Sequence, residues 1–421
     1  MMAEPRPRIC LVVENAPYPF DRRVYLEATT LAEAGYNVVV IAPAEPGQAL
    51  RERVGAVEVR RFPLRPGSSV GGYLREYGLA LARIARLLTE VARERIPSVV
   101  HLANPPDVLF LAALPLRPLG TRIVFDHHDL MPELFAERYH GPLSPAIGQL
   151  LSLCERMSVR LADVVISTNA SYRRRVIARH AVHPSRVFVV RNGPLLREVA
   201  DACPDEQLQA QGVPVIGYVG LMAPQDGVGL LVDVAQELRC LGLADFRMLL
   251  IGDGPELPAI RARLAALGLA AHFDIRGRVR DHARVLSLLA ACDLCVAPDP
   301  WTPANDVSTF IKVVEYLGLG RPIVATDLRE TRASAGEAAV YVPPGNARAM
   351  AEVIRVLLQD HERRARLATL ARERLVSAQL AWDFQRRRLL EVYQRLAGSP
   401  RDGSRGVPLA SRPAALAPDD G

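Results

Sequence analysis

The stretch Asn305-Asp306-Val307-Ser308-Thr309-Phe310-Ile311-Lys312-Val313-Val314-Glu315-Tyr316 is the most informative part of this 421-residue sequence. It contains Lys312, the only lysine among 52 basic residues. A lysine ammonium is a compact point charge that the wide arginine fork does not replace at a tight phosphate site. The turn Gly320-Arg321-Pro322 then leads into the apolar run Ile323–Ala325. Such a return places the start of the preceding helix near the carboxyl ends of neighbouring strands in an α/β sheet.

The stretch predicts a helix with capping signals at both ends. Ser308 or Thr309 precedes an apolar-periodic run and is expected to cap the helix. Gly318 and Gly320 are expected to end it near Leu319. This prediction would put the amino-terminal end of the helix at the sheet edge where ligands bind.

Ser308, Lys312 and Glu315 are spaced so that they share one face of the predicted helix. The opposite face is apolar: Phe310, Val313, Val314 and Leu317. A helix start attracts anions, and a glutamate can accept two hydrogen bonds from a ribose diol. The pattern therefore predicts a nucleotide-sugar site formed by the 308–310 helix start, Lys312 and Glu315. The alternative is a solvated Lys–Glu pair that stabilises the helix by only about 0.3 kcal/mol.

Composition restricts the classes of protein that need to be considered. Hydrophobic residues make up 49% and charged residues 23%, which is ordinary for a soluble globular protein. The net charge of +6 suits small anionic ligands and is too weak to indicate nucleic acid. Six scattered cysteines fit a reducing compartment, and Cys292 and Cys295 are expected to be buried structural thiols. The longest uncharged apolar run, Val108–Leu116, is too short to span a bilayer, so we expect a cytoplasmic protein.

Two similar halves follow one another in the sequence. Each alternates short β-branched runs with helical stretches, which predicts parallel sheets covered on both faces and a ligand cleft between two doubly wound domains. The predicted strands are Ile9–Val13, Val38–Ile41, Val99–Leu102, Ile123–Phe125, Val164–Ser167 and Val187–Val190, then Val215–Val219, Arg247–Ile251, Phe273–Ile275, Leu294–Ala297, Ile323–Ala325 and Val340–Val342. The predicted boundaries are 1–195 and 212–378 for the domains, 196–211 for a linker, 379–397 for a last helix and 398–421 for a disordered tail.

Two glycine-rich turns follow strands of the second half. Gly220 ends one strand, and Gly252-Asp253-Gly254-Pro255 follows the next and opens a helix. Glycine lets the backbone approach a ligand closely, so Gly220, Gly252, Gly254 and Pro255 are candidate donor-binding residues. An ordinary strand-to-helix turn is the alternative for each. Neither turn is a GxGxxG fingerprint, which argues against nicotinamide binding.

In the first half, Asp126-His127-His128-Asp129 directly follows a predicted buried strand. Charged and imidazole groups at a strand's carboxyl end are typical of a cleft. Successive residues of an extended segment point in opposite directions, so at most two of the four side chains converge and no metal site is expected. Capping of the next helix would explain Asp129 but not two histidines.

These motifs together resemble the retaining glycosyltransferases of family 4, which have the GT-B fold of two tandem Rossmann-like domains. The resemblance covers about residues 8–396 and rests on six segments: Pro17–Arg23, Leu31–Val38, Phe125–Asp129, Val190–Gly193, Ile251–Pro255 and Lys312–Val324. It implies a C-terminal domain that binds the nucleotide-sugar, an N-terminal acceptor domain and a last helix that crosses back. Glu315 matches the ribose-binding glutamate of the family's Glu-x7-Glu motif. His128 matches the histidine beside the transferred sugar, with Asp129 next to it.

The sequence departs from the family pattern at two positions. Val307 stands where the first glutamate of the motif usually lies, and Leu221–Gly227 lacks the usual arginine and lysine. Both departures touch donor binding and increase the share that Lys312 must carry. A similar subgroup has the same Ser-x3-Lys-x2-Glu pattern, which favours activity.

The expected activity is transfer of a sugar, with retention of its anomeric configuration, from an NDP-sugar to a hydroxyl of an unknown acceptor. UDP is the expected nucleotide, no metal or other cofactor is expected, and the product would serve glycan, polysaccharide or glycoconjugate synthesis. His128, Asp129 and Lys312 are the expected catalytic residues. A non-catalytic nucleotide-sugar-binding paralogue and a nucleotide-sugar epimerase stay open as alternatives.

The acceptor domain also offers a candidate contact with the inner face of a membrane. Five arginines concentrate charge near one helix: Arg173, Arg174, Arg175, Arg179 and Arg186. Such a patch could dock weakly on anionic lipids if the acceptor is lipid-linked. A solvated helix face is the alternative. The loops 62–73 and 130–145 are expected to select the acceptor.

Overall fold

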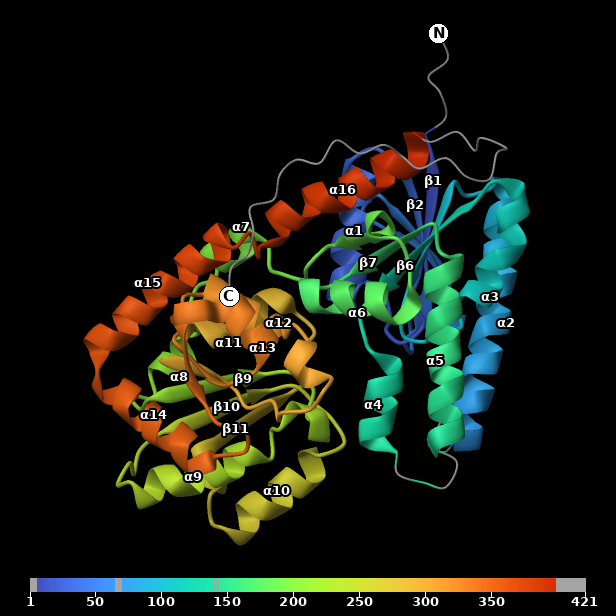
Figure 1. The fold of residues 1–421 in the computed structure, drawn as a ribbon. Helices are drawn as coiled ribbons and strands as arrows, with labels where there is room; N and C mark the ends of the chain where they lie inside the picture. The colour runs from blue at the N-terminus through green and yellow to red at the C-terminus, as the bar shows by residue number, and fades with distance from the viewer. Residues whose placement is uncertain (1–5, 65–69, 140, 142–143, 399–421) are drawn as a thin grey trace.

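The computed structural model describes residues 6–64, 70–139, 141 and 144–398. They form two α/β domains, each with helices on both faces of a mainly parallel sheet (Figure 1). This is the GT-B arrangement that the sequence predicts. The predicted disordered tail lies, from residue 399 on, outside the described residues.

The first domain contains an eight-stranded sheet in the order β3-β4-β2-β1-β5-β6-β7-β8, parallel except for the β3–β4 pair. Its strands are β1 (Arg8–Val12), β2 (Asn37–Ala44), β3 (Arg51–Val54), β4 (Val57–Pro63), β5 (Val99–Ala103), β6 (Arg122–His127), β7 (Val164–Ser167) and β8 (Val187–Val189). Its helices are α1 (Arg22–Glu33), α2 (Val70–Glu94), α3 (Phe110–Ala113), α4 (Met131–Arg138), α5 (Ser144–Leu161) and α6 (Ala170–His180), with 3₁₀ turns η1 (Leu114–Leu119) and η2 (Pro184–Arg186).

The second domain contains a six-stranded parallel sheet in the order β11-β10-β9-β12-β13-β14. Its strands are β9 (Val215–Val219), β10 (Arg247–Ile251), β11 (Phe273–Gly277), β12 (Leu294–Ala297), β13 (Ile323–Thr326) and β14 (Ala339–Val342). Its helices are α9 (Leu230–Cys240), α10 (Leu257–Ala266), α11 (His282–Ala290), α12 (Ile311–Gly318), α13 (Arg329–Ala335), α14 (Ala347–Gln359) and α15 (His361–Ser377). Four 3₁₀ turns complete it: η3 (Pro224–Asp226), η4 (Ala270–His272), η5 (Asn305–Val307) and η6 (Gly336–Ala338).

All twelve predicted strands are present, and the hairpin β3–β4 was missed. Strand β3 has mainly exposed polar residues, and β4 carries Arg60 and Arg61 at buried positions. Ion pairs neutralise both arginines: Arg60 lies 2.6 Å from Glu58, and Arg61 lies 2.6 Å from Glu52. The strands were predicted from apolar runs, so a strand whose sequence contains charged residues is missed. Cys292 and Cys295 are buried and free, as expected.

The predicted linker is folded against the second domain. It contains α7 (Leu196–Ala200) and α8 (Glu206–Gln209), and α7 contacts both α11 and α12. At Gly318 of α12, an added Cβ would lie 2.8 Å from Val199 of α7. The glycine therefore permits the close packing of this connection on α12.

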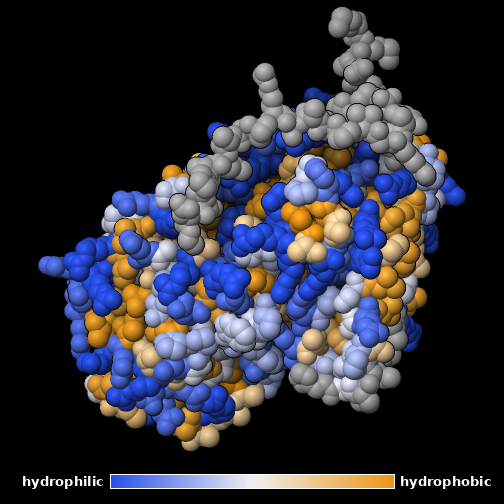
Figure 2. All heavy atoms as spheres, in the orientation of Figure 1, coloured by the Kyte–Doolittle hydropathy of each residue, from blue (hydrophilic) through white to orange (hydrophobic). Residues whose placement is uncertain are grey.

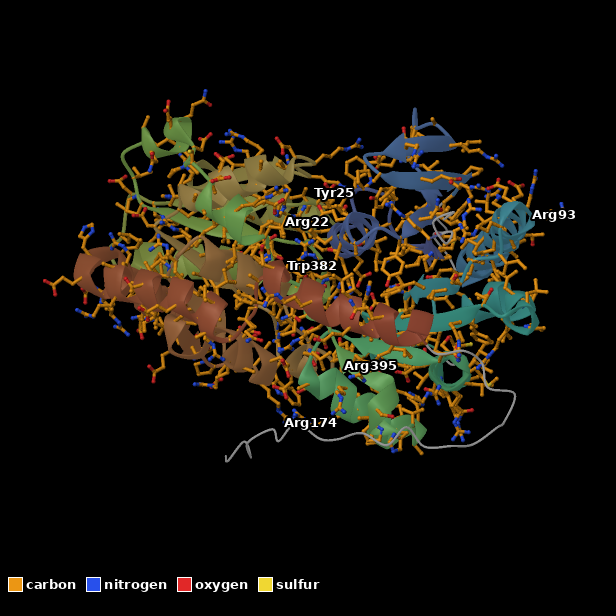
Figure 3. The ribbon with its side chains drawn as sticks, turned by 90° about the horizontal axis from the view of Figure 1, so that it is seen from above. Arg22, Tyr25, Arg93, Arg174, Trp382 and Arg395 are labelled. Atoms are coloured by element: carbon orange, nitrogen blue, oxygen red, sulfur yellow. The ribbon has the colours of Figure 1, made fainter. Side chains whose placement is uncertain are left out.

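The last helix, α16 (Trp382–Gly398), crosses back to the first domain as predicted (Figure 3). The Trp382 indole N–H donates to Thr30 Oγ1 of α1 at 3.0 Å. The outgoing and returning chains meet at Gly193, where an added Cβ would lie 2.0 Å from the carbonyl oxygen of Leu380. Among the described residues, the structure contains no helix with the length and apolar character needed to cross a bilayer.

Candidate active site in the inter-domain cleft

The two glycine turns of the second domain pack directly on each other. Gly220 N–H donates to the carbonyl of Ile251 at 3.0 Å. An added Cβ on Gly252 would lie 1.9 Å from the Gly220 carbonyl oxygen, and one on Gly254 would lie 2.3 Å from that of Met222. Gly252 also has a φ of 140°. Gly252 and Gly254 therefore require glycine because the backbone of the first turn approaches them closely.

These turns line a pocket of about 570 Å³ together with Leu221, Asp253 and Arg278. Pro255 is exposed and is not among the described residues that line it. Arg278 was not predicted as a site residue, although it follows β11 directly. It and Arg280 lie 3.6 and 3.1 Å from Glu45, which brings the first domain to the rim of this pocket.

A second pocket, of about 290 Å³, shares Gly220 with the first and contains most of the predicted donor-binding residues. It is lined by Val219, Gly220, Asp226, Thr309, Phe310, Ile311, Lys312 and Glu315. The structure thus brings the lysine, the glutamate and the first glycine turn to one cavity.

The predicted start of the lysine helix is wrong. Helix α12 begins at Ile311 with Phe310 as its N-cap, so Ser308 and Thr309 lie outside the helix and do not cap it. Ser308 therefore does not share a helix face with Lys312, and Phe310 lines the pocket ahead of the helix. Instead, the Ser308 hydroxyl donates to the Ala304 carbonyl, and the Thr309 hydroxyl accepts from Asn169 Nδ2.

Lys312 lies in a buried ion pair. Its Nζ donates to Asp299 Oδ1 at 2.6 Å, and the Lys312 and Asp299 side chains are 6% and 1% exposed. The ammonium also lies 5.0 Å from the ring centres of Tyr218 and Phe310. Burial raises the pKa of Asp299, and the neighbouring Lys312 opposes that rise. The surface Lys–Glu pair considered as an alternative is therefore wrong, because the lysine partner is a buried aspartate.

Glu315 is buried one turn further along α12, on the wall of the same pocket. Burial raises its pKa to about 7, although Arg22 of the first domain opposes the rise. His282 Nε2 lies 3.7 Å from its carboxylate. With a pKa of about 7, the Glu315 carboxyl is about half-ionised at neutral pH. Hydrogen-bond donors of a bound ligand would favour its ionised form.

His128 is oriented by Asp126 at the carboxyl end of β6. Its Nε2 lies 2.5 Å from Asp126 Oδ2, so Nε2–H donates to the carboxylate and Nδ1 is left as the other ring nitrogen. Arg23 holds the same carboxylate through two hydrogen bonds, of 2.8 and 2.7 Å. Burial alone would raise the pKa of Asp126, but Arg23 and the two histidines that contact it, His128 and His101, hold the pKa well below its ordinary value. Asp126 is therefore an ionised acceptor.

The other two residues of this segment behave differently. The buried His127 ring lies 3.2 Å from Glu155 and 5.7 Å from the centre of the Tyr172 ring. Asp129 lies next to His128, and Asn104 fixes the backbone of both: its Oδ1 accepts from their N–H groups at 2.5 and 3.1 Å. Within the segment, the structure brings the side chains of His128 and Asp126 into contact. The catalytic role expected for Asp129 stays a prediction.

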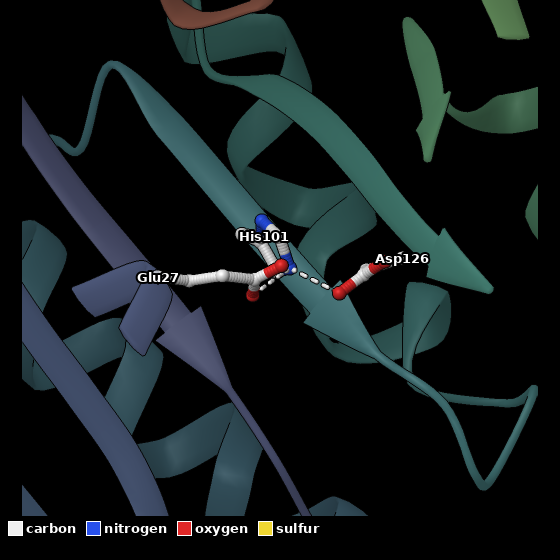
Figure 4. Close-up of side chains that lie close together, drawn as sticks. All are labelled: Glu27, His101 and Asp126. Atoms are coloured by element: carbon white, nitrogen blue, oxygen red, sulfur yellow. Dashed lines mark hydrogen bonds and ion pairs between the residues drawn. The ribbon is translucent and has the colours of Figure 1, made fainter. Parts of the chain in front are cut away.

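Behind His128 lies the buried group Glu27, His101 and Asp126, which brings three potential metal-ligating atoms within 4.8 Å of one another (Figure 4). Arg23 lies 3.2 Å from Glu27 and 2.7 Å from Asp126. Burial and the nearby Asp126 raise the pKa of Glu27 well above its ordinary value, while burial lowers that of His101. Arg23 thus donates to both oxygens of Asp126, the ionised carboxylate of this group.

Residues that were not predicted join the two domains beside the pocket. Asn169 and Tyr172, at the start of α6, hydrogen-bond to the 307–309 segment of the second domain. His127 pairs with Ser167 in the β6–β7 register, which places His128 beside the residues that lead to Asn169. Asn169 and His128 both follow the carboxyl end of a buried strand. This position in the sequence could have identified Asn169 as a candidate site residue.

Comparisons with known proteins agree with this geometry. Two family models match: a "Glycosyl transferase 4-like domain" over residues 21–193 and "Glycosyl transferases group 1" over residues 213–360. Alpha-D-kanosaminyltransferase of Streptomyces kanamyceticus is 26% identical over 355 residues, covering 79% of this chain and 88% of the relative. The GDP-mannose-dependent alpha-mannosyltransferase of Mycobacterium tuberculosis is 28% identical over 304 residues, covering 70% and 72%.

Solved structures show the same fold. Sucrose-phosphate synthase of Thermosynechococcus elongatus superposes with a TM-score of 0.75 at 19% identity and covers 94% of this chain and 100% of that one. HepE of Anabaena, in complex with UDP-glucose, superposes with a TM-score of 0.68 at 16% identity and covers 93% and 100%. Because the family models, the curated relatives and the two-domain fold all agree, this chain is a glycosyltransferase of the GT-B fold.

Proposed function

We propose that the protein transfers a sugar from an NDP-sugar, with UDP as the nucleotide, to an acceptor hydroxyl with retention of anomeric configuration. The observation that carries the proposal is the shared pocket of Gly220, Lys312 and Glu315. It combines an amino-terminal helix end, a buried cation and a carboxylate, which suit a diphosphate and a ribose. The UDP-glucose bound to HepE, a protein of the same fold, supports this choice of nucleotide.

Lys312 and the start of α12 are the groups that would stabilise the departing diphosphate. An ammonium has three N–H donors, and Asp299 accepts one of them at 2.6 Å. A cation that is already held in place needs little reorganisation when negative charge develops on the leaving group. The position of the helix start at Ile311, directly before Lys312, adds free backbone N–H groups to the same site.

Glu315 would accept the ribose hydroxyls, and the two glycine turns would bring backbone close to the nucleotide. His128, held by Asp126, would present Nδ1 to the sugar or to the acceptor hydroxyl, with Asp129 beside it. Retention would follow from departure and attack on the same face of the sugar, without a metal. Closure of the two domains would exclude water from the reacting groups.

A transfer assay tests this proposal. The protein is incubated with UDP-glucose, UDP-N-acetylglucosamine or GDP-mannose and a panel of sugar, aminocyclitol and lipid-linked acceptors. Released nucleotide and the anomeric configuration of the product are measured. Acceptor-dependent release of UDP with a retained configuration supports the proposal. An altered donor sugar without acceptor would favour the epimerase, and nucleotide binding without turnover across the panel would favour the non-catalytic paralogue.

Membrane contact through the five-arginine patch stays a prediction. Arg175 lies 3.2 Å from Glu133, and Arg179 lies 2.9 Å from Glu155, while Arg173 donates to the carbonyl of Val187 at 2.9 Å. These internal contacts reduce the charge that the five-arginine patch offers to lipid. Figure 2 shows hydrophobic residues along the edge of the first domain beside α2 and α3, where Leu79 and Leu111 are exposed. We expect weak cosedimentation of the protein with anionic vesicles at low salt. If the protein does not cosediment, the prediction of membrane contact is wrong.

A further inference from the structure

The segment Val307–Thr309, between η5 and α12, is held from the other domain. Asn169 Nδ2 donates to the Val307 carbonyl oxygen at 2.9 Å and to Thr309 Oγ1 at 3.0 Å. The Tyr172 hydroxyl lies 2.8 Å from Ser308 Oγ. Three consecutive residues of the donor domain are thus bound by two side chains of the acceptor domain.

The directions of these bonds follow from the neighbouring contacts. Ser308 Oγ donates its single proton to the Ala304 carbonyl at 2.7 Å, so the Tyr172 hydroxyl is the donor to Ser308 Oγ. Asn169 Oδ1 accepts from Tyr172 N–H at 2.7 Å and caps α6, which fixes the amide with its NH₂ toward Val307. Asn169 and Tyr172 are 0% and 3% exposed. The contacts are therefore buried and geometrically defined.

A third acceptor-domain side chain supports the same segment. Arg191 Nη2 donates to Ser334 Oγ at 3.0 Å and lies 3.4 Å from Thr309 Oγ1. Thr309 itself lines the pocket that contains Lys312 and Glu315. The bonds from the acceptor domain thus end on the wall of the proposed donor site.

We propose that Asn169 and Tyr172 are positioning residues that hold the 307–309 segment in its donor-binding conformation, so that donor binding and domain closure stabilise each other. This inference rests on the proposed function for the identity of the ligand. A domain movement that separates α6 from the segment breaks all three hydrogen bonds. By linkage, a ligand that favours the held segment must favour the closed domains by the same free energy.

Tyr172→Phe tests the inference, because it removes one hydroxyl and keeps the ring. Tyr341→Phe is the matched control: the Tyr341 hydroxyl donates to the Gly336 carbonyl at 2.8 Å, within the second domain. Binding of UDP is measured by calorimetry, and hydrogen exchange is measured over residues 305–318 with and without UDP. One lost hydrogen bond predicts roughly two- to tenfold weaker UDP binding and faster exchange of 305–318 for Tyr172→Phe only.

A second variant keeps the inference testable if one phenol contributes little. Asn169→Asp retains the oxygen that caps α6 and replaces the donor NH₂ with a carboxylate facing the Val307 carbonyl. It is expected to weaken UDP binding more than Tyr172→Phe. In a double-mutant cycle, the loss of UDP-binding free energy in Tyr172→Phe/Ser308→Ala should be smaller than the sum of the losses in the two single variants.

Outcomes separate this inference from the proposed function. Unchanged UDP affinity and unchanged exchange over 305–318 in both Tyr172→Phe and Asn169→Asp would overturn the positioning role. If the wild-type protein binds no nucleotide, the proposed function fails. In that case the exchange of 305–318 without ligand still decides whether Tyr172 and Asn169 hold the segment.

Discussion

Lys312 has two roles in this account, one in the fold and one in the donor site, and a pair of variants separates them. Lys312→Met removes the partner of Asp299, whose side chain is 1% exposed and lies 2.6 Å from the ammonium. Breaking a buried ion pair by removing one member costs about 3–5 kcal/mol of unfolding free energy. Lys312→Met/Asp299→Leu removes both charges, and replacement of a buried pair by apolar residues is close to neutral.

The two variants should differ in stability and agree in binding. Both lose a charge-assisted hydrogen bond to the diphosphate, worth about 1.5–3 kcal/mol, which corresponds to about 10- to 150-fold weaker UDP binding. Chemical denaturation measures the first property and calorimetry with UDP the second. Recovery of stability without recovery of UDP affinity is the expected result. A double variant that binds UDP as well as the wild type would refute the ligand role of Lys312.

The single variant also has a predicted pH dependence. Burial raises the pKa of Asp299, and without Lys312 only a backbone hydrogen bond opposes that rise. A carboxyl whose pKa is higher in the folded state than in the unfolded state loses its contribution to stability as pH rises from the unfolded-state pKa to the folded-state pKa. The stability deficit of Lys312→Met should therefore be larger at pH 8 than at pH 5. A deficit that is independent of pH would contradict the assignment of Asp299 as the orphaned group.

Three further predictions concern other parts of the site. Burial raises the pKa of Glu315 from 4.5 to about 7, so its ionisation opposes folding as pH rises between these values. The stability of Glu315→Gln relative to the wild type should therefore increase by about 2–3 kcal/mol between pH 5 and pH 8. Denaturation of the ligand-free protein measures this difference. His128→Gln should lower the transfer rate by roughly a hundredfold and leave the UDP dissociation constant within about twofold, because His128 follows β6 of the first domain and the proposed nucleotide site lies on the second. An equal loss of UDP affinity would place it in nucleotide binding instead. Gly252→Ala should destabilise the protein by about 2 kcal/mol or more, since its Cβ would meet the facing glycine turn at 1.9 Å, whereas Gly47→Ala, with a φ of +85° and no atom within 4 Å of the added Cβ, should cost less.

Periodicity and glycine position were sufficient to predict twelve of the fourteen strands of the described residues and the two glycine turns. The apolar runs of β9 and β10 are buried on both faces of a parallel sheet, which leaves a strong pattern in the sequence. Gly220 and Gly252 follow those strands, and their close contact is a local consequence of two neighbouring strands ending together. These features depend on short segments and are therefore visible in the chain.

The errors concern groups whose partners come from distant parts of the chain. Ser308 looked like a helix cap, but its hydroxyl bonds to Ala304 and to Tyr172 of the other domain, and α12 starts three residues later. The capping rule describes local competition for backbone N–H groups, so it cannot include a partner 136 residues away. Asp299, the partner of Lys312, had a usable signal, because it stands two residues after the buried strand β12.

The most direct test of the account is a thermal-shift titration of the wild-type protein with UDP, GDP, ADP and uridine. Because a ligand at 100 times its Kd stabilises the folded state by about 2.7 kcal/mol, a single nucleoside diphosphate should raise the melting temperature in a saturable way, and uridine should raise it far less. This result would show that the cleft recognises a diphosphate and would identify the base. If none of UDP, GDP and ADP shifts the melting temperature, the proposed donor site is contradicted.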